Sequence, residues 1–281
     1  MIAILCGLGA AACWAVTILT ATRASRSIGS AATLAWVMLT GLVIVGPVAL
    51  AQGVPSGLDR QSATWLVIAG AGNVGGLLLV YAGVRIGKVG VVAPIVSTEG
   101  AVAAVIAVAA GEELGAWTGL ALAVVVVGVV LSSRPALEPG TELGDPRAVV
   151  FAIAAACAFG ASLYATGRAS ADLTIVWAVL PPRLLGVVFV TIPLLVARRL
   201  QLTREAAPFV VASGIAEVVG FVSFAIGARH GIAVTAVLGS QFAGLAALAA
   251  RFLFGERLGR TATIGVVVIA VGVAAVSALR V

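Results

Sequence analysis

The sequence predicts an all-α membrane protein with ten transmembrane helices, arranged as two inverted five-helix repeats. Three observations predict this fold: an extremely apolar composition, ten apolar stretches of membrane-spanning length, and a register of residues that recurs after 144 positions. Hydrophobic residues make up 62% of the chain, charged residues 10%, and the mean hydropathy is +1.20. A soluble domain carries about 25% charged residues. A chain this apolar therefore needs lipid around most of its surface.

The apolar stretches are separated by short polar breaks. A helix needs roughly 20 apolar residues to cross the hydrocarbon core of a bilayer. The first stretch begins at Met1 with almost no basic lead, so we interpret it as a retained helix and not a removed signal peptide. The ten predicted spans are residues 2–22, 32–51, 64–83, 89–110, 115–133, 148–167, 173–197, 208–227, 232–251 and 260–279.

The two halves of the chain repeat one another. Shifted by 144 residues, residues 83–87 (GVRIG) fall on 227–231 (GARHG), and residues 111–115 (GEELG) fall on 255–259 (GERLG). Apolar composition alone does not place arginine, glutamate and glycine in shared registers. The predicted units are a first repeat at 1–133, a linker at 134–147 and a second repeat at 148–281. Because each repeat has an odd number of spans, the second enters the membrane in the opposite sense.

These motifs resemble the EamA-type members of the drug/metabolite transporter superfamily over nearly the whole chain. The resemblance rests on two five-helix repeats whose fourth helix closes with a Gly-Glu-x-Leu turn, and on residues 89–94 (VGVVAP), which look like the family's entry into helix four. Arg183 matches an arginine often seen in the second helix of a repeat, although Met38 stands there in the first repeat. The resemblance implies ten helices and a central cavity lined largely by helices three, four, eight and nine.

A few polar residues lie deep inside predicted spans. An intramembrane charge costs at least a few kcal/mol, so each one is a candidate for function. Asn73 occupies the repeat position of Glu217, and Gln241 that of Ser97. The predicted substrate-binding or coupling residues are Asn73, Glu99, Arg183, Glu217 and Gln241.

Each candidate also has a structural interpretation. Arg183 and a glutamate can form a buried pair that fixes helix packing, and a buried glutamate can stay protonated and hydrogen-bonded. We expect Asn73, Glu99, Glu217 and Gln241 to border one cavity. Glu99 has the weakest support from the repeat, because its repeat mate is the apolar Ala243.

Other motifs have a structural explanation. Residues 70–75 (GAGNVG) fit the dinucleotide pattern G-x-G-x-x-G, but they lie inside an apolar span and not between a strand and a helix. Gly72 and Gly76 instead form a G-x-x-x-G face for close helix packing. Glu112 stands near a helix start, where the helix dipole favours a carboxylate. Arg229 lies at a turn where it would snorkel to lipid headgroups.

The orientation in the membrane stays open. With a cytoplasmic N-terminus, the inside loops hold four arginines, and the outside loops hold twelve lysines and arginines, the reverse of the positive-inside rule. The charges therefore favour both termini outside, whereas the resemblance implies both inside.

The predicted function is secondary transport of a small metabolite, such as an amino acid or a drug-like polar or amphipathic compound, across the cytoplasmic membrane of a prokaryote by alternating access. Proton coupling is left open, as are two alternatives: a lipid-carrier flippase on the same fold, and a non-transporting membrane partner protein. We expect no enzyme activity, cofactor, metal or nucleic-acid partner, because neither a nucleophile–base pair, a metal cluster nor a phosphate loop is recognisable. The expected partners are the substrate and membrane lipid, with the chain a monomer or a homodimer.

Overall fold

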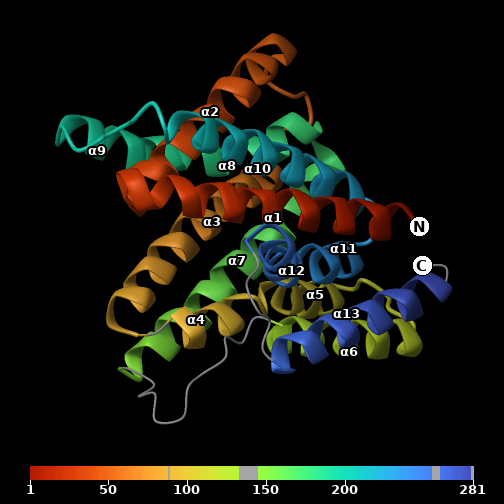
Figure 1. Cartoon of the computed structure of the whole chain (residues 1–281). Coiled ribbons are helices and arrows are strands. Elements are labelled where there is room, and N and C mark those ends of the chain that lie inside the picture. The colour runs from red at the N-terminus through yellow and green to blue at the C-terminus, as the bar shows by residue number, and fades with distance from the viewer. Residues whose placement is uncertain (88, 133–144, 255–259, 280–281) are drawn as a thin grey trace.

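The computed structural model describes residues 1–87, 89–132, 145–254 and 260–279, and these fold into a bundle of helices (Figure 1). The chain is an all-α membrane protein. The predicted linker and the second Gly-Glu-x-Leu turn fall largely or wholly outside the described residues. The helices are α1 (Ile2–Ile28), α2 (Ser30–Gln52), α3 (Arg60–Ile86), α4 (Val89–Val96), α5 (Glu99–Ala109), α6 (Ala116–Ser132), α7 (Arg147–Asp172), α8 (Ile175–Gly186), the π-helical turn η1 (Val187–Thr191), α9 (Ile192–Val196), α10 (Ala207–Ala228), α11 (Ile232–Gly239), α12 (Phe242–Phe254) and α13 (Arg260–Ala278).

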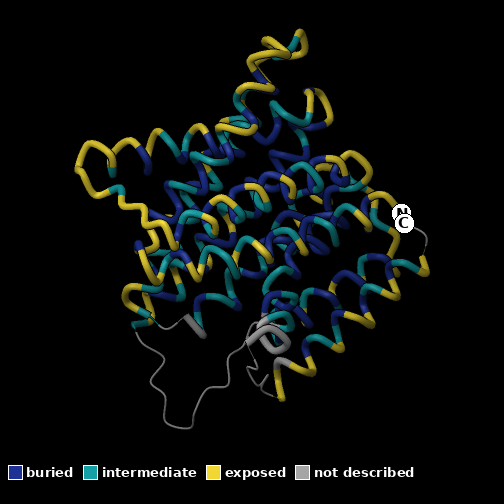
Figure 2. Tube along the Cα trace, turned by 45° about the horizontal axis from the view of Figure 1, so that its top comes forward, coloured by how far each residue is buried: buried dark blue, intermediate teal, exposed yellow. Residues whose placement is uncertain are grey.

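Seven helical stretches are long and apolar enough to cross a membrane by length and composition, and three shorter apolar helices accompany them. The shorter ones, Ala116–Ser132, Ile232–Ala246 and Thr263–Ala278, coincide with the fifth, ninth and tenth predicted spans. Many large apolar side chains are exposed, as expected where lipid is the solvent. Figure 2 shows exposed residues recurring along the outer helices of the bundle. The count of ten spans stays a prediction.

The predicted fourth and ninth spans each contain a break in the helix, which the sequence analysis did not foresee. The fourth breaks at Ser97 and Thr98, between α4 and α5, and the ninth breaks at Ser240 and Gln241, between α11 and α12. At each break a hydroxyl donates back into the preceding turn: Ser97 to the Pro94 carbonyl at 2.8 Å, and Ser240 to the Val237 carbonyl at 2.9 Å. Such side-chain bonds compete with the helical pattern. The two breaks occupy nearly the same repeat position.

Helices from the two halves interlock. α1 packs along α10, α3 along α7, and α6 along α13 (Figure 1). Glycines permit this close approach: a β carbon on Gly72 of α3 would lie 2.6 Å from the Ala158 carbonyl oxygen of α7, as the G-x-x-x-G face predicted. The N-terminus and the end of α13 lie at the right of Figure 1. We call that end of the bundle the amino-terminal side and the other end the far side.

The central core contains a cluster of aromatic side chains. Trp14 of α1 lies with its ring centre 5.2 Å from Phe221, 6.1 Å from Phe224 and 6.2 Å from Phe242. Trp14, Phe221 and Phe224 are buried. We call these four residues the aromatic plug. It joins α1, α10 and α12 at mid-bundle.

Candidate functional site

A cavity of about 320 Å³ lies on the far side of the bundle between α1, α2, α3, α7 and α10. Its rim includes Thr22 and Ser30, which are exposed near the turn between α1 and α2. Glu217 and Phe159, from the middle of their helices, also line it. The cavity thus extends from the far side to mid-bundle. Its lining residues are Thr17, Ile18, Ala21, Thr22, Ser25, Ser30, Thr33, Leu34, Val37, Met38, Asn73, Leu77, Tyr81, Phe159 and Glu217.

Two of the five predicted site residues line this cavity. Asn73 comes from α3 and Glu217 from α10, and they are repeat mates separated by 144 residues. Glu217 is 12% exposed. A shared cavity is what the inverted repeat predicted from the sequence would produce, because such a repeat brings equivalent positions to similar depth on opposite walls.

Arg183 lies behind Glu217. Its side chain is 1% exposed, and its Nη2 lies 3.9 Å from the Glu217 Oε1. The same nitrogen donates to the backbone carbonyl of Glu217 at 3.4 Å, and Nη1 donates to the Val179 carbonyl at 3.0 Å. The guanidinium carbon stands 4.3 Å from the centre of the Phe221 ring. Arg183 therefore counters the charge of Glu217 from within the protein, while its own donors are turned mainly to backbone oxygens.

Glu99 and Gln241 are placed differently from the expectation of one shared cavity. Both are buried at the helix breaks, and neither is among the residues that line this cavity. The two breaks lie close together, since a β carbon on Gly100 would lie 2.6 Å from the Ser240 hydroxyl oxygen. Of the predicted third, fourth, eighth and ninth spans, only the third and eighth contribute to the lining. The remaining lining residues come from α1, α2 and α7.

Sequence reasoning missed the hydroxyl groups of the cavity. Thr17, Thr22, Ser25, Ser30 and Thr33 all line it. The lining residues of α1 recur at intervals of three or four, which places them on one face of the helix. The signal that could have indicated them is the run of hydroxyl residues along the second half of α1. A mean hydropathy over the whole span does not reveal such a run.

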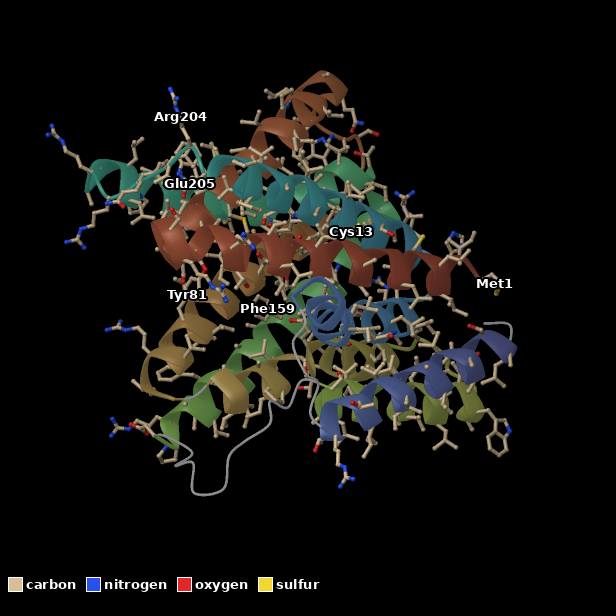
Figure 3. The ribbon with its side chains drawn as sticks, viewed as in Figure 1. Met1, Cys13, Tyr81, Phe159, Arg204 and Glu205 are labelled. Atoms are coloured by element: carbon tan, nitrogen blue, oxygen red, sulfur yellow. The ribbon has the colours of Figure 1, made fainter. Side chains whose placement is uncertain are left out.

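Aromatic side chains complete the cavity wall. Tyr81 of α3 and Phe159 of α7 both line it, and Figure 3 labels them. The Phe159 ring packs against Gly76, where a β carbon would lie 2.8 Å from the ring. Gly220 is the repeat mate of Gly76, and Trp14 falls on Phe159 when the shift is 145 residues instead of 144. This second pair shows the same arrangement, since a β carbon on Gly220 would lie 2.8 Å from the Trp14 Nε1. Repeat mates thus form the cavity wall in one case and the aromatic plug in the other.

The amino-terminal side is held by polar contacts between the halves. The Glu112 carboxylate accepts hydrogen bonds from the backbone N–H groups of Ile232 and Ala233, both at 3.1 Å. It therefore caps α11 of the second half, and not the helix that follows it in sequence. A carboxylate at a helix N-terminus satisfies free N–H groups and complements the helix dipole.

Arg229 corrects a second expectation on the same side. Its side chain does not only reach for headgroups: Nε donates to the Ser170 carbonyl, and Nη2 donates to the Leu173 carbonyl at 2.8 Å. These carbonyls belong to the end of α7 and the residue after it. Arg229 thereby ties α10 to α7 at the amino-terminal side.

A second cavity of about 440 Å³ lies on the amino-terminal side, lined in part by Glu112, Arg168 and Arg229. It shares no lining residue with the far-side cavity. Along α10 the order is Glu217 at the first cavity, then Phe221 and Phe224 of the aromatic plug, then Ala228 at the second cavity. The aromatic plug therefore lies between the levels of the two cavities.

Comparison with known proteins finds one family whose model matches part of the chain. Residues 1–134 match the model of the EamA-like transporter family. A solved structure described as "Crystal structure of protein" is similar to this chain with a TM-score of 0.81 and 19% sequence identity, covering 99% of this chain and 96% of that one. At that identity the likeness concerns the fold alone. No curated protein sequence matches the chain.

Proposed function

We propose, from the match of residues 1–134 to the model of the EamA-like transporter family, that the chain is a secondary transporter of a small polar or amphipathic metabolite. The transport cycle is alternating access across the cell membrane. The observation that carries the proposal is the one-sided cavity, which reaches Glu217 at mid-bundle from the far side. A binding site near mid-membrane that opens to one side at a time is the arrangement typical of such transporters.

The proposal includes ten spans in two inverted repeats. Three features support it: the exchanged packing of α1 with α10 and α3 with α7, the matched breaks in both fourth helices, and the two aromatic rings seated on repeat-mate glycines. Broken helices at mid-membrane are recurrent in transporters built from inverted repeats. The polar contacts of Glu112 and Arg229 form the closed gate in this conformation.

The direct test is flux of candidate solutes into vesicles reconstituted with the purified protein. Ala21 lines the cavity, so Ala21→Trp fills part of it and should abolish flux while the protein still folds. Ala71 is exposed on α3, and Ala71→Trp is the matched control that should transport normally. Equal flux in both variants would exclude this cavity as the route. Movement of labelled lipid carriers, and not of water-soluble solutes, would favour a flippase.

The finer proposal is that Glu217 couples transport to protons. Glu217 is the carboxylate among the described residues that line the cavity, so it is the group that substrate and protons would share. Glu217→Gln should abolish uptake driven by a proton gradient, yet leave exchange at saturating substrate on both sides. Gradient-driven uptake that survives this change would show that Glu217 is not the coupling group.

A further inference from the structure

The charge of the cavity lining has one sign. Among its described residues Glu217 is the sole acidic side chain, and there is neither a lysine, an arginine nor a histidine. Arg183 is the nearby cation, but it is 1% exposed and is not a lining residue. Its guanidinium is held against Phe221 and two backbone carbonyls. A solute in the cavity therefore meets the carboxylate of Glu217 before it meets the guanidinium.

The Glu217 carboxylate retains binding capacity. Its distance of 3.9 Å from the Arg183 Nη2 exceeds hydrogen-bonding range. An ionised carboxylate has about four lone-pair sites for donors. Within the described part of the chain, the hydrogen bond between these two residues goes to the backbone oxygen of Glu217 and not to its carboxylate. The carboxylate can therefore accept hydrogen bonds from a ligand without first losing one to Arg183.

The hydroxyl groups reinforce this polarity. Thr17 donates to the Cys13 carbonyl at 3.1 Å, Ser25 to the Thr22 carbonyl at 2.9 Å, and Thr33 to the Gly29 carbonyl at 2.9 Å. Because each hydroxyl has one hydrogen to donate, these three present lone pairs to the cavity. The cavity wall is thus rich in acceptors, and it favours a ligand that brings donors and positive charge.

The remaining wall suits the rest of such a ligand. Phe159 and Tyr81 offer aromatic faces, which attract cations through the ring quadrupole. Leu34, Met38 and Leu77 offer apolar surface. The volume of about 320 Å³ lies near the lower end of the range for small-molecule sites, roughly 300–1,000 Å³. The site therefore fits a small molecule with one cationic head and a short apolar body.

We propose that the far-side cavity binds a small organic ammonium compound, with the ammonium group at Glu217 and the apolar part against Phe159 and Leu34. This inference rests on the proposed transport function, since it names the substrate class of the same site. An anionic solute would face the Glu217 carboxylate and the hydroxyl lone pairs. A zwitterion would bring an acid group for which the described lining has no cation.

Binding of matched probes to the purified full chain in detergent tests the inference without requiring transport. The probes are phenethylammonium, benzyltrimethylammonium, phenylacetate and zwitterionic phenylalanine, followed by isothermal titration. Both ammonium probes should bind, and Glu217→Gln should weaken them at least tenfold. Glu205→Gln removes an exposed carboxylate outside this cavity and should leave their affinity unchanged. Phenylacetate or phenylalanine binding as tightly as phenethylammonium would overturn the proposal.

A second variant covers the case in which Glu217→Gln fails to fold. Asn73 is the repeat mate of Glu217 on the opposite part of the wall, so Asn73→Asp adds a second carboxylate. It should tighten binding of both ammonium probes severalfold, and unchanged or weaker binding would count against the inference. Flux into vesicles separates the two proposals. Ammonium binding without flux would refute transport alone, whereas flux of uncharged solutes that ignores Glu217→Gln would refute the substrate class alone.

Discussion

The two sides of the bundle hold residues that the 144-residue register pairs with one another, but the paired residues differ in their contacts. On the far side a cavity extends inward to Glu217, and Arg85 at the end of α3 is exposed. On the amino-terminal side its repeat mate Arg229 bonds to two carbonyls, and Glu112 caps α11. The same exchange occurs at mid-bundle, where Phe159 lines the cavity while Trp14 is buried in the aromatic plug.

In the proposed transport cycle, this difference defines what closes the amino-terminal side. The closed side relies on a small number of directed hydrogen bonds at helix ends, together with aromatic packing at mid-bundle. Each such bond contributes roughly 0.5–1.5 kcal/mol net. A transition between two states that differ by a few kcal/mol is within reach of ligand binding. The inverted-repeat proposal adds that opening the amino-terminal side would give it the arrangement now seen on the far side.

The largest expected effect concerns the charge pair beneath the cavity. Arg183→Leu leaves Glu217 without its counter-charge, and removal of one partner from a buried pair costs about 3–5 kcal/mol. The partial exposure and long distance of this pair place the expected loss near the lower value. The midpoint temperature of thermal unfolding in detergent should therefore fall by several degrees.

The double variant Arg183→Leu/Glu217→Leu supplies the control. With both charges gone, no buried charge is left uncompensated, and stability should recover most of the loss. Uptake driven by a proton gradient should be absent in the double variant, because the Glu217 carboxylate is missing. A single variant as stable as the unmodified protein would show that the Arg183–Glu217 contact does not support the cavity floor.

The next effect tests the closed side directly. Glu112→Ala removes the acceptor of the Ile232 and Ala233 N–H groups, which should cost about 1–2 kcal/mol. If this cap holds the amino-terminal side shut, the open state gains roughly tenfold in population. A buried reporter, Ala228→Cys, should then react faster with a water-soluble maleimide. The three native cysteines are first replaced by alanine.

Glu113→Ala is the matched control for this experiment. Glu113 is the exposed neighbour of Glu112, so its loss should leave the reaction of the Ala228→Cys reporter unchanged. Equal reactivity in the Glu112→Ala and Glu113→Ala backgrounds would mean that the cap is not part of the gate.

Some of this organisation was predictable from sequence. The register of 144 residues predicted that Asn73 and Glu217 are mates, and the structure places both on one cavity. Arg183 stood out because a lone arginine inside an apolar span is costly. Glycine spacing predicted the close approach of α3 to α7. These features depend on residue identity and order, which a sequence displays directly.

The helix breaks and the cavity wall were harder to predict from the sequence. Pro94 hints at the first break, but no proline accompanies the second, where Ser240 donates into the preceding turn. The sequence of an apolar span has the same composition whether its helix is continuous or broken, because both parts of a broken helix lie in the same apolar surroundings. The contacts of Glu112 with α11 join residues about 120 positions apart. Local sequence pattern carries no signal for such a partner.

A smaller effect is expected from a comparison of the repeat mates Arg85 and Arg229. Arg229→Lys replaces two directed bonds to carbonyls with one mobile ammonium, because lysine lacks the planar fork of arginine. The substitution should lower the free energy of unfolding by about 1 kcal/mol, measured by thermal unfolding. Arg85→Lys changes an exposed side chain and should stay within about 0.5 kcal/mol of the unmodified protein. Equal losses of unfolding free energy in the two variants would show that the hydrogen bonds of Arg229 do not stabilise the closed side.

The smallest effect concerns the caps of two equivalent helices on opposite sides. Asp59 accepts a hydrogen bond from the Ser62 N–H at 2.7 Å before α3, and its repeat mate Thr203 accepts one from the Ala206 N–H at 3.2 Å before α10. Hydrogen bonds from Ser62 lower the pKa of the Asp59 carboxyl below its ordinary value. A carboxyl with a lowered pKa in the folded state contributes stability above its unfolded pKa, and loses that contribution as pH falls through the folded value.

Acidification should therefore loosen the start of α3 and leave the start of α10 unaffected, since a threonine hydroxyl does not titrate. Hydrogen exchange of the Ser62 and Ala206 amides, corrected for the intrinsic pH dependence of exchange, measures both ends in one sample. Asp59→Thr places before α3 the residue type that Thr203 supplies in the turn before α10, and it should abolish the difference. If the Ser62 amide keeps its protection at acidic pH as well as the Ala206 amide does, the two caps are equivalent and the pH response must originate elsewhere.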